Sequence, residues 1–189
     1  MLNPISYRRL FTLANGKKVK CRLVNGPDVD HLVSLFQQAP PEDTYFLKQD
    51  VKDKNFIKNW LKRLDHCQTV LVALDLDKDH LIATAHMDRG LGCARHIGEI
   101  QQVFVARPFQ NLGLGSLMLG ELIDLARTEN LQWLKAEVVS EHKKAVKGFL
   151  GKGFKIKATL EDFFVGRDGL TYDVALLTRP VFKEREDDF

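Results

Sequence analysis

The sequence predicts a single-domain α/β (α+β) protein in which a mixed, mostly antiparallel central sheet of about seven strands is flanked by about four helices on both faces. Three observations predict this class. Strand-like and helix-like segments alternate in the order β-αα-βββ-α-β-α-ββ. Strands expected to form hairpins indicate antiparallel neighbours, and a later β-α-β order indicates a mixed sheet. No repeat, low-complexity tract or flexible linker divides residues 1–182, and residues 183–189 are expected to be a short, frayed charged tail.

The first third of the chain predicts one strand and two helices. Residues 19–24 are an alternating, β-branched run that ends at the turn sequence Asn25-Gly26-Pro27. Apolar residues at helical spacing then predict a helix that stops before Pro40 and Pro41. After the polar stretch 40–54, the same spacing predicts a second helix, capped by Asp53. The apolar residues are Val29, Leu32, Val33 and Phe36 in the first helix and Ile57, Trp60, Leu61 and Leu64 in the second.

The remaining elements follow in close succession. Residues 69–76 and 80–89 are strand-like runs with a short polar connection, which predicts an antiparallel hairpin. A strand at 97–105 runs into a glycine-bearing turn and a long helix, and a strand at 132–139 precedes a helix that ends at 151–153. Strands at 155–160 and 171–178 surround a turn at 166–169. The long helix is expected to bury Leu119, Leu122, Ile123 and Ala126.

Composition excludes several classes of protein. The 189 residues are 44% hydrophobic and 28% charged, which is typical of a globular domain. A formal net charge of +3 is too small to indicate binding to nucleic acid or to an anionic membrane. No apolar segment approaches the ~20 residues of a transmembrane helix, and residues 1–11 have no signal-peptide pattern. Three cysteines without a Cys-x-x-Cys pair favour a reduced, cytoplasmic protein.

The segment 98–116 joins the end of a predicted strand to the start of a helix and carries Gly113 and Gly115. Glycine permits a positive φ and close approach to the backbone, and the first amides of a helix attract anions, so a phosphate is a natural ligand here. A plainer interpretation is that both glycines only permit a tight turn. The next glycine is Gly120, and no Gly-Lys-Ser/Thr follows, which excludes the two common nucleotide-binding loops.

The residues around these glycines resemble the GCN5-related N-acetyltransferase (GNAT) family. Residues 110–115 read Gln-Asn-Leu-Gly-Leu-Gly and resemble the family signature Gln/Arg-x-x-Gly-x-Gly/Ala, and the strand end Val103-x-Val105 is similar to the one that precedes this signature. Residues 145–154 resemble the closing helix of the family, which usually ends in Lys-x-Gly-Phe or a near variant. The resemblance extends over residues 19–178, and the element order agrees with it.

The resemblance implies that acetyl-CoA is the acyl donor and that an amine receives the acetyl group. The six histidines show no His-Glu-x-x-His spacing and the cysteines are not paired, so no metal site is expected. The resemblance also implies that the pyrophosphate lies on the main-chain amides of the glycine loop, and that the pantetheine arm pairs with the exposed main chain of the strand that ends at 105. A main-chain amide there would polarise the thioester carbonyl. The coenzyme-binding residues so implied are Val103, Phe104, Val105, Gln110, Asn111, Leu112, Gly113, Leu114, Gly115 and Ser116.

A carboxylate is needed to deprotonate the amine, because a free alkylammonium has a pKa of ~10.4. Glu99 stands eleven positions before Gln110, where several members of the family carry a catalytic glutamate, so the resemblance implies Glu99 as the base. Strand alternation puts Glu99 on the face of Gln101, Val103 and Val105, although a bulge, common here in the family, would change that. The alternative is an edge-exposed or salt-bridged carboxylate without a catalytic role.

Two positions depart from the family pattern. Phe149 replaces a tyrosine that protonates the leaving thiolate in many relatives, and phenylalanine has no proton to donate. A thiolate of pKa ~8.5 is a tolerable leaving group, and Tyr172, Cys93 or a water could act as the acid instead. His142 replaces a frequent asparagine. It could contact the coenzyme, although capping of the helix or plain exposure to solvent is the favoured interpretation.

These observations predict an N-acetyltransferase that passes an acetyl group from acetyl-CoA to a primary amine by direct attack in a ternary complex. The acceptor can be a protein lysine, a protein N-terminus or a small amine, and residues 46–51 are similar to domains that modify lysines. The alternative is a catalytically weak acyl-CoA-binding sensor or regulatory module of the same fold. We expect an acyl-CoA and an amine acceptor as partners, no nucleic acid and no membrane, and a monomer or homodimer.

Overall fold

The computed structural model describes residues 7–47, 51–62, 64 and 67–182, and in these ranges eight strands and five α-helices form. The strands are β1 (Arg8–Thr12), β2 (Lys18–Leu23), β3 (Gln68–Asp75), β4 (His80–Arg89), β5 (Ile97–Val105), β6 (Trp133–Val139), β7 (Lys155–Val165) and β8 (Thr171–Pro180). The helices are α1 (Val29–Gln37), α2 (Pro41–Thr44), α3 (Lys54–Lys62), α4 (Leu114–Thr128) and α5 (Lys143–Gly151). None of these helices has the length and apolar character needed to cross a membrane.

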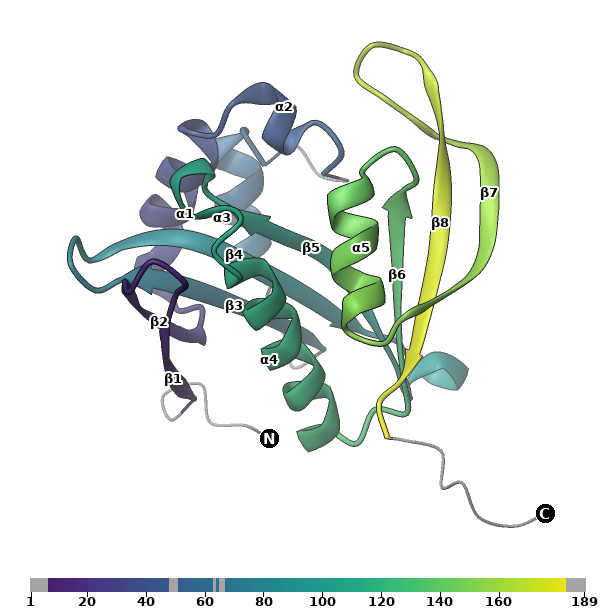
Figure 1. The fold of residues 1–189 in the computed structure, drawn as a ribbon, viewed down its shortest axis with the longest axis horizontal. Coiled ribbons are helices and arrows are strands. Elements are labelled where there is room, and N and C mark those ends of the chain that lie inside the picture. The colour runs from purple at the N-terminus through teal and green to yellow at the C-terminus, as the bar shows by residue number, and fades with distance from the viewer. Residues whose placement is uncertain (1–6, 48–50, 63, 65–66, 183–189) are drawn as a thin grey trace.

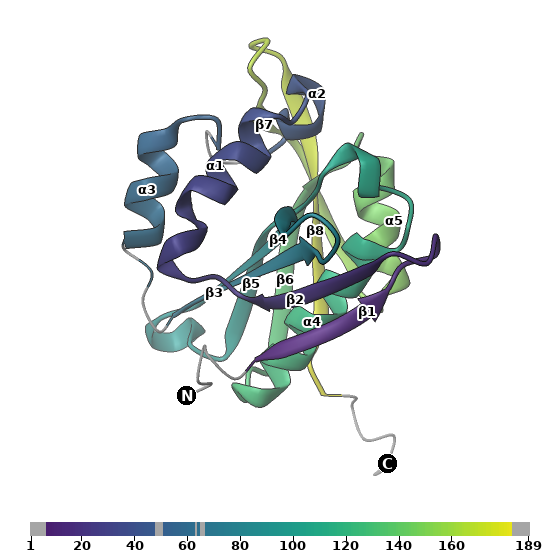
Figure 2. The same ribbon diagram turned by 90° about the vertical axis from the view of Figure 1, so that its left-hand side faces the viewer.

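All eight strands belong to one sheet with the order β1-β2-β3-β4-β5-β6-β8-β7. Every neighbouring pair is antiparallel except β5 and β6, which are parallel. Helices α1 and α3 cover one face of the sheet, and α4 and α5 cover the other (Figures 1 and 2). The predicted fold class is therefore confirmed, with slightly more strands and helices than expected.

The centre of the sheet is its most apolar part. In β3 every residue after Gln68 is buried, because α1 and α3 pack on one face and α4 on the other. The predicted hairpin of β3 and β4 is confirmed, with Thr69 opposite Met87 in its register.

Two hydrophobic clusters lie on opposite faces of the sheet. The first packs α4 against the strands and contains all four residues predicted to form the buried face of that helix, Leu119, Leu122, Ile123 and Ala126. The second contains Phe36 of α1 and Ile57 of α3. The predicted cap at Asp53 is also found, since its Oδ1 accepts a hydrogen bond of 2.8 Å from the Asn55 amide. Burial of each large aliphatic side chain in these clusters contributes roughly 1.5–3 kcal/mol.

Two elements are absent from the sequence-based prediction. Strand β1 is mostly exposed, so its residues do not alternate between buried and exposed positions. It forms because it pairs with β2, from Arg8 opposite Arg22 to Thr12 opposite Lys18. Helix α2 has only four residues and begins at Pro41, where the fixed φ of proline suits a first helical turn. Two predicted features lie partly or wholly outside the described residues. They are residues 48–50 of the segment 46–51, which is similar to domains that modify lysines, and the charged tail 183–189.

The hairpin of β7 and β8 is longer than predicted, because β7 continues to Val165. The predicted turn at 166–169 is confirmed and lies close to Tyr45, just after α2 (Figure 1). The Asp168 amide donates a hydrogen bond of 3.2 Å to the Tyr45 hydroxyl, and the Tyr172 hydroxyl donates one of 2.7 Å to Asp168. The rings of Phe46 and Tyr172 also meet, at 5.3 Å between centroids. The tip of the hairpin is thus joined to the segment after α2.

Candidate active site

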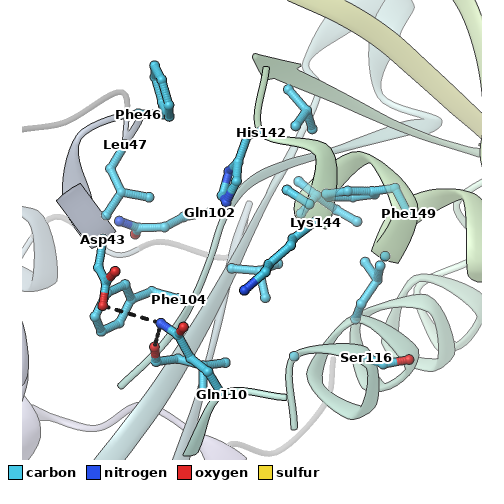
Figure 3. A pocket seen from close by; sticks show the side chains of 18 of the residues that line it. Asp43, Phe46, Leu47, Gln102, Phe104, Gln110, Ser116, His142, Lys144 and Phe149 are labelled. Carbon is cyan, nitrogen blue, oxygen red and sulfur yellow. Dashed lines mark hydrogen bonds between the residues drawn. The ribbon is translucent and has the colours of Figure 1, made fainter. Parts of the chain in front are cut away.

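A cleft of about 500 Å³ opens where β5 and β6 diverge. The two strands pair from Ile97 opposite Trp133 only as far as Ile100 opposite Ala136. Strand β6 continues beside β8 to Val139, so no described strand pairs with β5 on that side from residue 101 onward. One wall of the cleft consists of β5 and the loop into α4, and the other of the end of β6 and α5, with the segment after α2 at one end (Figure 3).

The loop before α4 exposes a row of main-chain amides to this cleft. Asn111 has a φ of 60° and Gly113 a φ of 86°, both left-handed, and the Leu117 amide is the first with a helical acceptor, the Gly113 carbonyl at 3.0 Å. No carbonyl in the described chain accepts a well-formed hydrogen bond from the amides of residues 111–116. Of the ten predicted coenzyme-binding residues, nine line the cleft. Leu112 instead packs against the core cluster beneath α4.

The Gln110 side chain fixes the start of this loop. Its Nε2 donates to the Val105 carbonyl at 3.1 Å and to Asp43 Oδ2 at 3.3 Å (Figure 3). Asp43 also forms an ion pair with Arg107, and Glu42 binds the same guanidinium at 3.0 Å. Hydrogen bonding to Arg107 lowers the pKa of Asp43. The loop and α2 are therefore held together at the edge of the cleft.

Glu99 does not belong to the described residues that line the cleft. Its Oε2 lies 2.6 Å from Lys135 Nζ, an ion pair between neighbouring strands. A bulge in β5 sets its direction, because His86 of β4 pairs with Gln102, and Met87 pairs with Ile100. Glu99 therefore lies on the sheet face opposite to Val103 and Val105, which pack toward α4 as Ile100 does. The expectation that Glu99 shares their face is wrong, and its catalytic role stays a prediction.

His142 projects into the cleft from the start of α5 (Figure 3). It occupies the N-cap position, where its side chain makes no capping hydrogen bond and the residue is exposed to solvent, so the expected exposure is confirmed and the alternative capping role is not found. Its ring lies 6.1 Å from the ring of Phe46. Partial burial, and then the charge of Lys144, lower the pKa of His142, while Asp43 raises it. The imidazole is therefore neutral near pH 7 and can accept a proton.

Phe149, which replaces the usual acid, and the two residues considered as substitutes for it occupy three different settings. Phe149 is 7% exposed, lines the cleft and packs edge-on against Phe154 at 5.0 Å. Hydrogen bonding to Asp168 raises the pKa of Tyr172, and its hydroxyl is held at the tip of the β7–β8 hairpin. Cys93 is exposed in the turn Gly92–Ala94, before β5. Neither Tyr172 nor Cys93 is among the described residues that line the cleft.

Gln102 is a functional candidate that the sequence did not reveal. It is 5% exposed and lines the cleft, and its Nε2 has no hydrogen-bond partner. A buried donor without a partner is rare in native proteins and calls for an explanation. The sequence contained no signal for it, because Gln101 and Gln102 are chemically identical and only the bulge decides which one is buried.

Two further residues of the cleft were missed or misjudged. Asp43 stood in a stretch interpreted only as polar, and its partner Arg107 is 64 positions away in the sequence. Lys144 was not singled out in the sequence; it is exposed at the start of α5 and also lines the cleft. Among the described residues, no cluster of three or more histidines, cysteines or carboxylates is arranged to hold a metal ion.

Solved structures resemble this fold over almost its entire length. The GNAT domain of S. lividans PAT is 21% identical, covers 95% of this chain and 99% of its own, and gives a TM-score of 0.77. Ribosomal-protein-S5-alanine acetyltransferase from Vibrio fischeri is 16% identical, with 91% and 96% covered and a TM-score of 0.76. Spermidine N-acetyltransferase from Vibrio cholerae, in complex with CoA and spermine, is 18% identical, with 86% and 95% covered and a TM-score of 0.73. At these identities the likeness establishes the fold.

The family follows from the sequence itself. No curated protein matches the chain. The model of the Acetyltransferase (GNAT) family matches residues 30–154, which include the glycine loop, the cleft-lining part of β5 and all of α5. The chain therefore belongs to the GNAT family of acetyltransferases.

Proposed function

We propose that the chain is an N-acetyltransferase that transfers the acetyl group of acetyl-CoA to a primary amine, by direct attack in a ternary complex. The observation that carries the proposal is the row of main-chain amides at residues 111–116, which have no partner in the described chain. These amides stand at the N-terminus of α4, where the helix dipole favours a diphosphate. The unpaired edge of β5 lies beside them.

The residues of the cleft fit the coenzyme. A Cβ built on Gly115 would lie 3.6 Å from Val105 Cγ2 and meets nothing closer, so glycine leaves space in front of the amides. The main chain of Val103 and Val105 offers hydrogen-bonding groups on the side away from β4, to which the pantetheine arm would bind. Lys144 adds a positive charge near the anion site. When bound, acetyl-CoA supplies the thioester whose acetyl group is transferred.

The amine must give up a proton, and two residues are candidates to accept it. Glu99 is the base that the family resemblance implies, but its carboxylate is paired with Lys135 and does not line the cleft. His142 lines the cleft and is neutral near pH 7. As an imidazolium it could then return the proton to the thiolate, which would supply the acid that Phe149 cannot.

A catalytically weak sensor of acyl-CoA remains the alternative, and Phe149 is the observation that favours it. Both functions require coenzyme binding, and only the enzyme requires turnover. The location that we propose is the cytoplasm, and the assembly a monomer or homodimer. The acceptor is not fixed by the fold, since one similar structure is named for an alanine of a ribosomal protein and another for spermidine.

The experiment that tests this proposal combines calorimetry and thiol release. The purified chain should bind acetyl-CoA, and it should release free CoA when a panel of amines is added. Gly115→Leu should weaken coenzyme binding, because the larger side chain would fill the space in front of the amides. Binding without turnover across peptide, lysine and polyamine acceptors would favour the sensor, and absence of binding would contradict both functions.

A further inference from the structure

Gln102 carries an unused hydrogen-bond donor inside the cleft. The residue lies in the middle of β5, opposite His86 of β4, and only 5% of its surface is exposed. Its amide projects into the cleft beneath Leu47 (Figure 3), and its Nε2 has no acceptor. Leaving such a group unsatisfied costs stability in the unliganded protein. A ligand that brings an acceptor oxygen to Nε2 would remove this cost.

The position of Gln102 identifies which substrate it would contact. The bulge in β5 turns Gln102 and Phe104 toward the α1 and α3 face, whereas Val103 and Val105 face α4. The glycine loop and its amides are on the α4 side of the cleft. Gln102 instead borders the part of the cleft lined by Asp43 and Leu47. The missing oxygen therefore belongs to the amine acceptor rather than to the diphosphate of the coenzyme.

The charges of the cleft limit the kind of amine. Three carboxylates line the described cleft, and each already has a partner. Those of Glu42 and Asp43 share Arg107, and Glu137 has an interaction of its own. A polyamine brings several positive charges and no acceptor oxygen at neutral pH, so it would find neither spare carboxylates nor a use for Gln102 Nε2.

We propose that the acceptor is an α-amine, such as the N-terminus of a peptide, whose neighbouring carbonyl oxygen accepts a hydrogen bond from Gln102 Nε2. This inference rests on the proposed function. Gln102 directly precedes Val103, at the unpaired strand edge that would hold the thioester, so the oxygen must lie only a few bonds from the attacking nitrogen. In an α-amine, nitrogen and carbonyl share one carbon. In a lysine side chain, four methylene groups separate the nitrogen from that carbon.

The test compares two amines that differ in one group on the carbon that bears the nitrogen, a carboxamide in alaninamide and a methyl group in isopropylamine. Gln102→Met keeps the shape of the side chain and removes the donor, and Gln132→Met, at an exposed position before β6, is the matched control. In wild type we expect kcat/KM for alaninamide to exceed that for isopropylamine. Gln102→Met should lower the ratio of the two values by about tenfold or more, and Gln132→Met should leave it unchanged. The change in this ratio from wild type to variant is the decisive quantity, because the intrinsic reactivity of each amine cancels in it.

Two results would overturn the inference. Equal losses for both amines would mean that Gln102 serves a step common to all acceptors, and a wild-type preference for spermidine or for an N-terminally blocked lysine peptide would exclude an α-amine site. Calorimetry with alaninamide in the presence of CoA separates this inference from the proposed function. Binding that depends on Gln102, without turnover, would contradict the enzyme and support the site. Binding that does not depend on Gln102 would contradict the site.

Discussion

Arg107 holds Asp43 at two points, with Nη2 2.9 Å from Oδ1 and Nε 3.1 Å from Oδ2. This pair joins α2 to the turn before α4, two segments that are far apart in the sequence. Because the same carboxylate accepts a hydrogen bond from Gln110, the pair also sets the position of the glycine loop.

The first prediction concerns the pH dependence of stability. The pKa of Asp43 is lowered in the folded protein by Arg107, so this pair stabilises the fold above the unfolded pKa of ~3.9, and the contribution is lost as the pH falls through the lower folded value. Arg107→Gln should therefore lower the urea midpoint more at pH 7 than at pH 3. Arg8→Gln, in the exposed β1, is the control. A difference between wild type and Arg107→Gln that is independent of pH would contradict the assignment.

The second prediction separates the two glycines of the loop. Gly113 has a φ of 86°, so Gly113→Ala should cost about 1–2 kcal/mol of unfolding free energy. Gly115 has an ordinary φ, and a Cβ there would make only a normal contact with Val105, so Gly115→Ala should be nearly neutral. Urea denaturation of both variants measures this. Equal destabilisation by the two substitutions would show that the left-handed turn at Gly113 is not the source of the cost.

The third prediction concerns the unsatisfied amide. Replacement of Gln102 by methionine should raise the unfolding free energy of the unliganded protein by about 1 kcal/mol, because a buried donor without a partner is removed. Gln68 provides the opposite case, since its Nε2 donates to Asp88 at 3.1 Å. Gln68→Met should therefore destabilise the protein. If chemical denaturation showed both variants to be less stable than wild type, Gln102 would have a partner in solution.

The fourth prediction identifies the proton acceptor from pH–rate profiles. If His142 accepts the proton, wild-type kcat/KM should rise through a pKa below 6.5, because burial and Lys144 lower that pKa while Asp43 opposes them. His142→Asn should remove this limb and lower kcat/KM by roughly 10²-fold. Glu99→Gln should have a much smaller effect, because Glu99 does not line the cleft. The opposite ranking of the two variants would assign the base to Glu99.

The sequence alone predicted those helices and strands whose own residues show a regular apolar pattern. The long helix α4 has a buried face at regular spacing, and β3 and β4 are apolar runs with a short connection, so all were predicted. Strand β1 could not be predicted in this way, because Arg8–Thr12 forms only through its pairing with β2. The same holds for α2, whose four residues are held near the glycine loop by Arg107.

The site was predictable where it depends on the backbone and not where it depends on side-chain direction. Glycines at a strand-to-helix turn indicate free amides, and the amides of residues 111–116 are without partners in the described chain. The direction of Glu99 and of Gln102 depends on a bulge that displaces one residue of β5, and no residue type in this segment signals it. The location of His142 in the cleft depends on how the start of α5 packs opposite Phe46, which is a property of the packed protein.

The aromatic residues after α2 have a consequence for how an acceptor enters. The ring of Phe46 lies beside both that of Tyr172 in β8 and that of His142, the N-cap of α5, so a bridge of rings connects the two sides of the cleft at the end near α2. An acceptor that enters the cleft at this end must pass these three rings, so their shape is one of the limits on which acceptors fit.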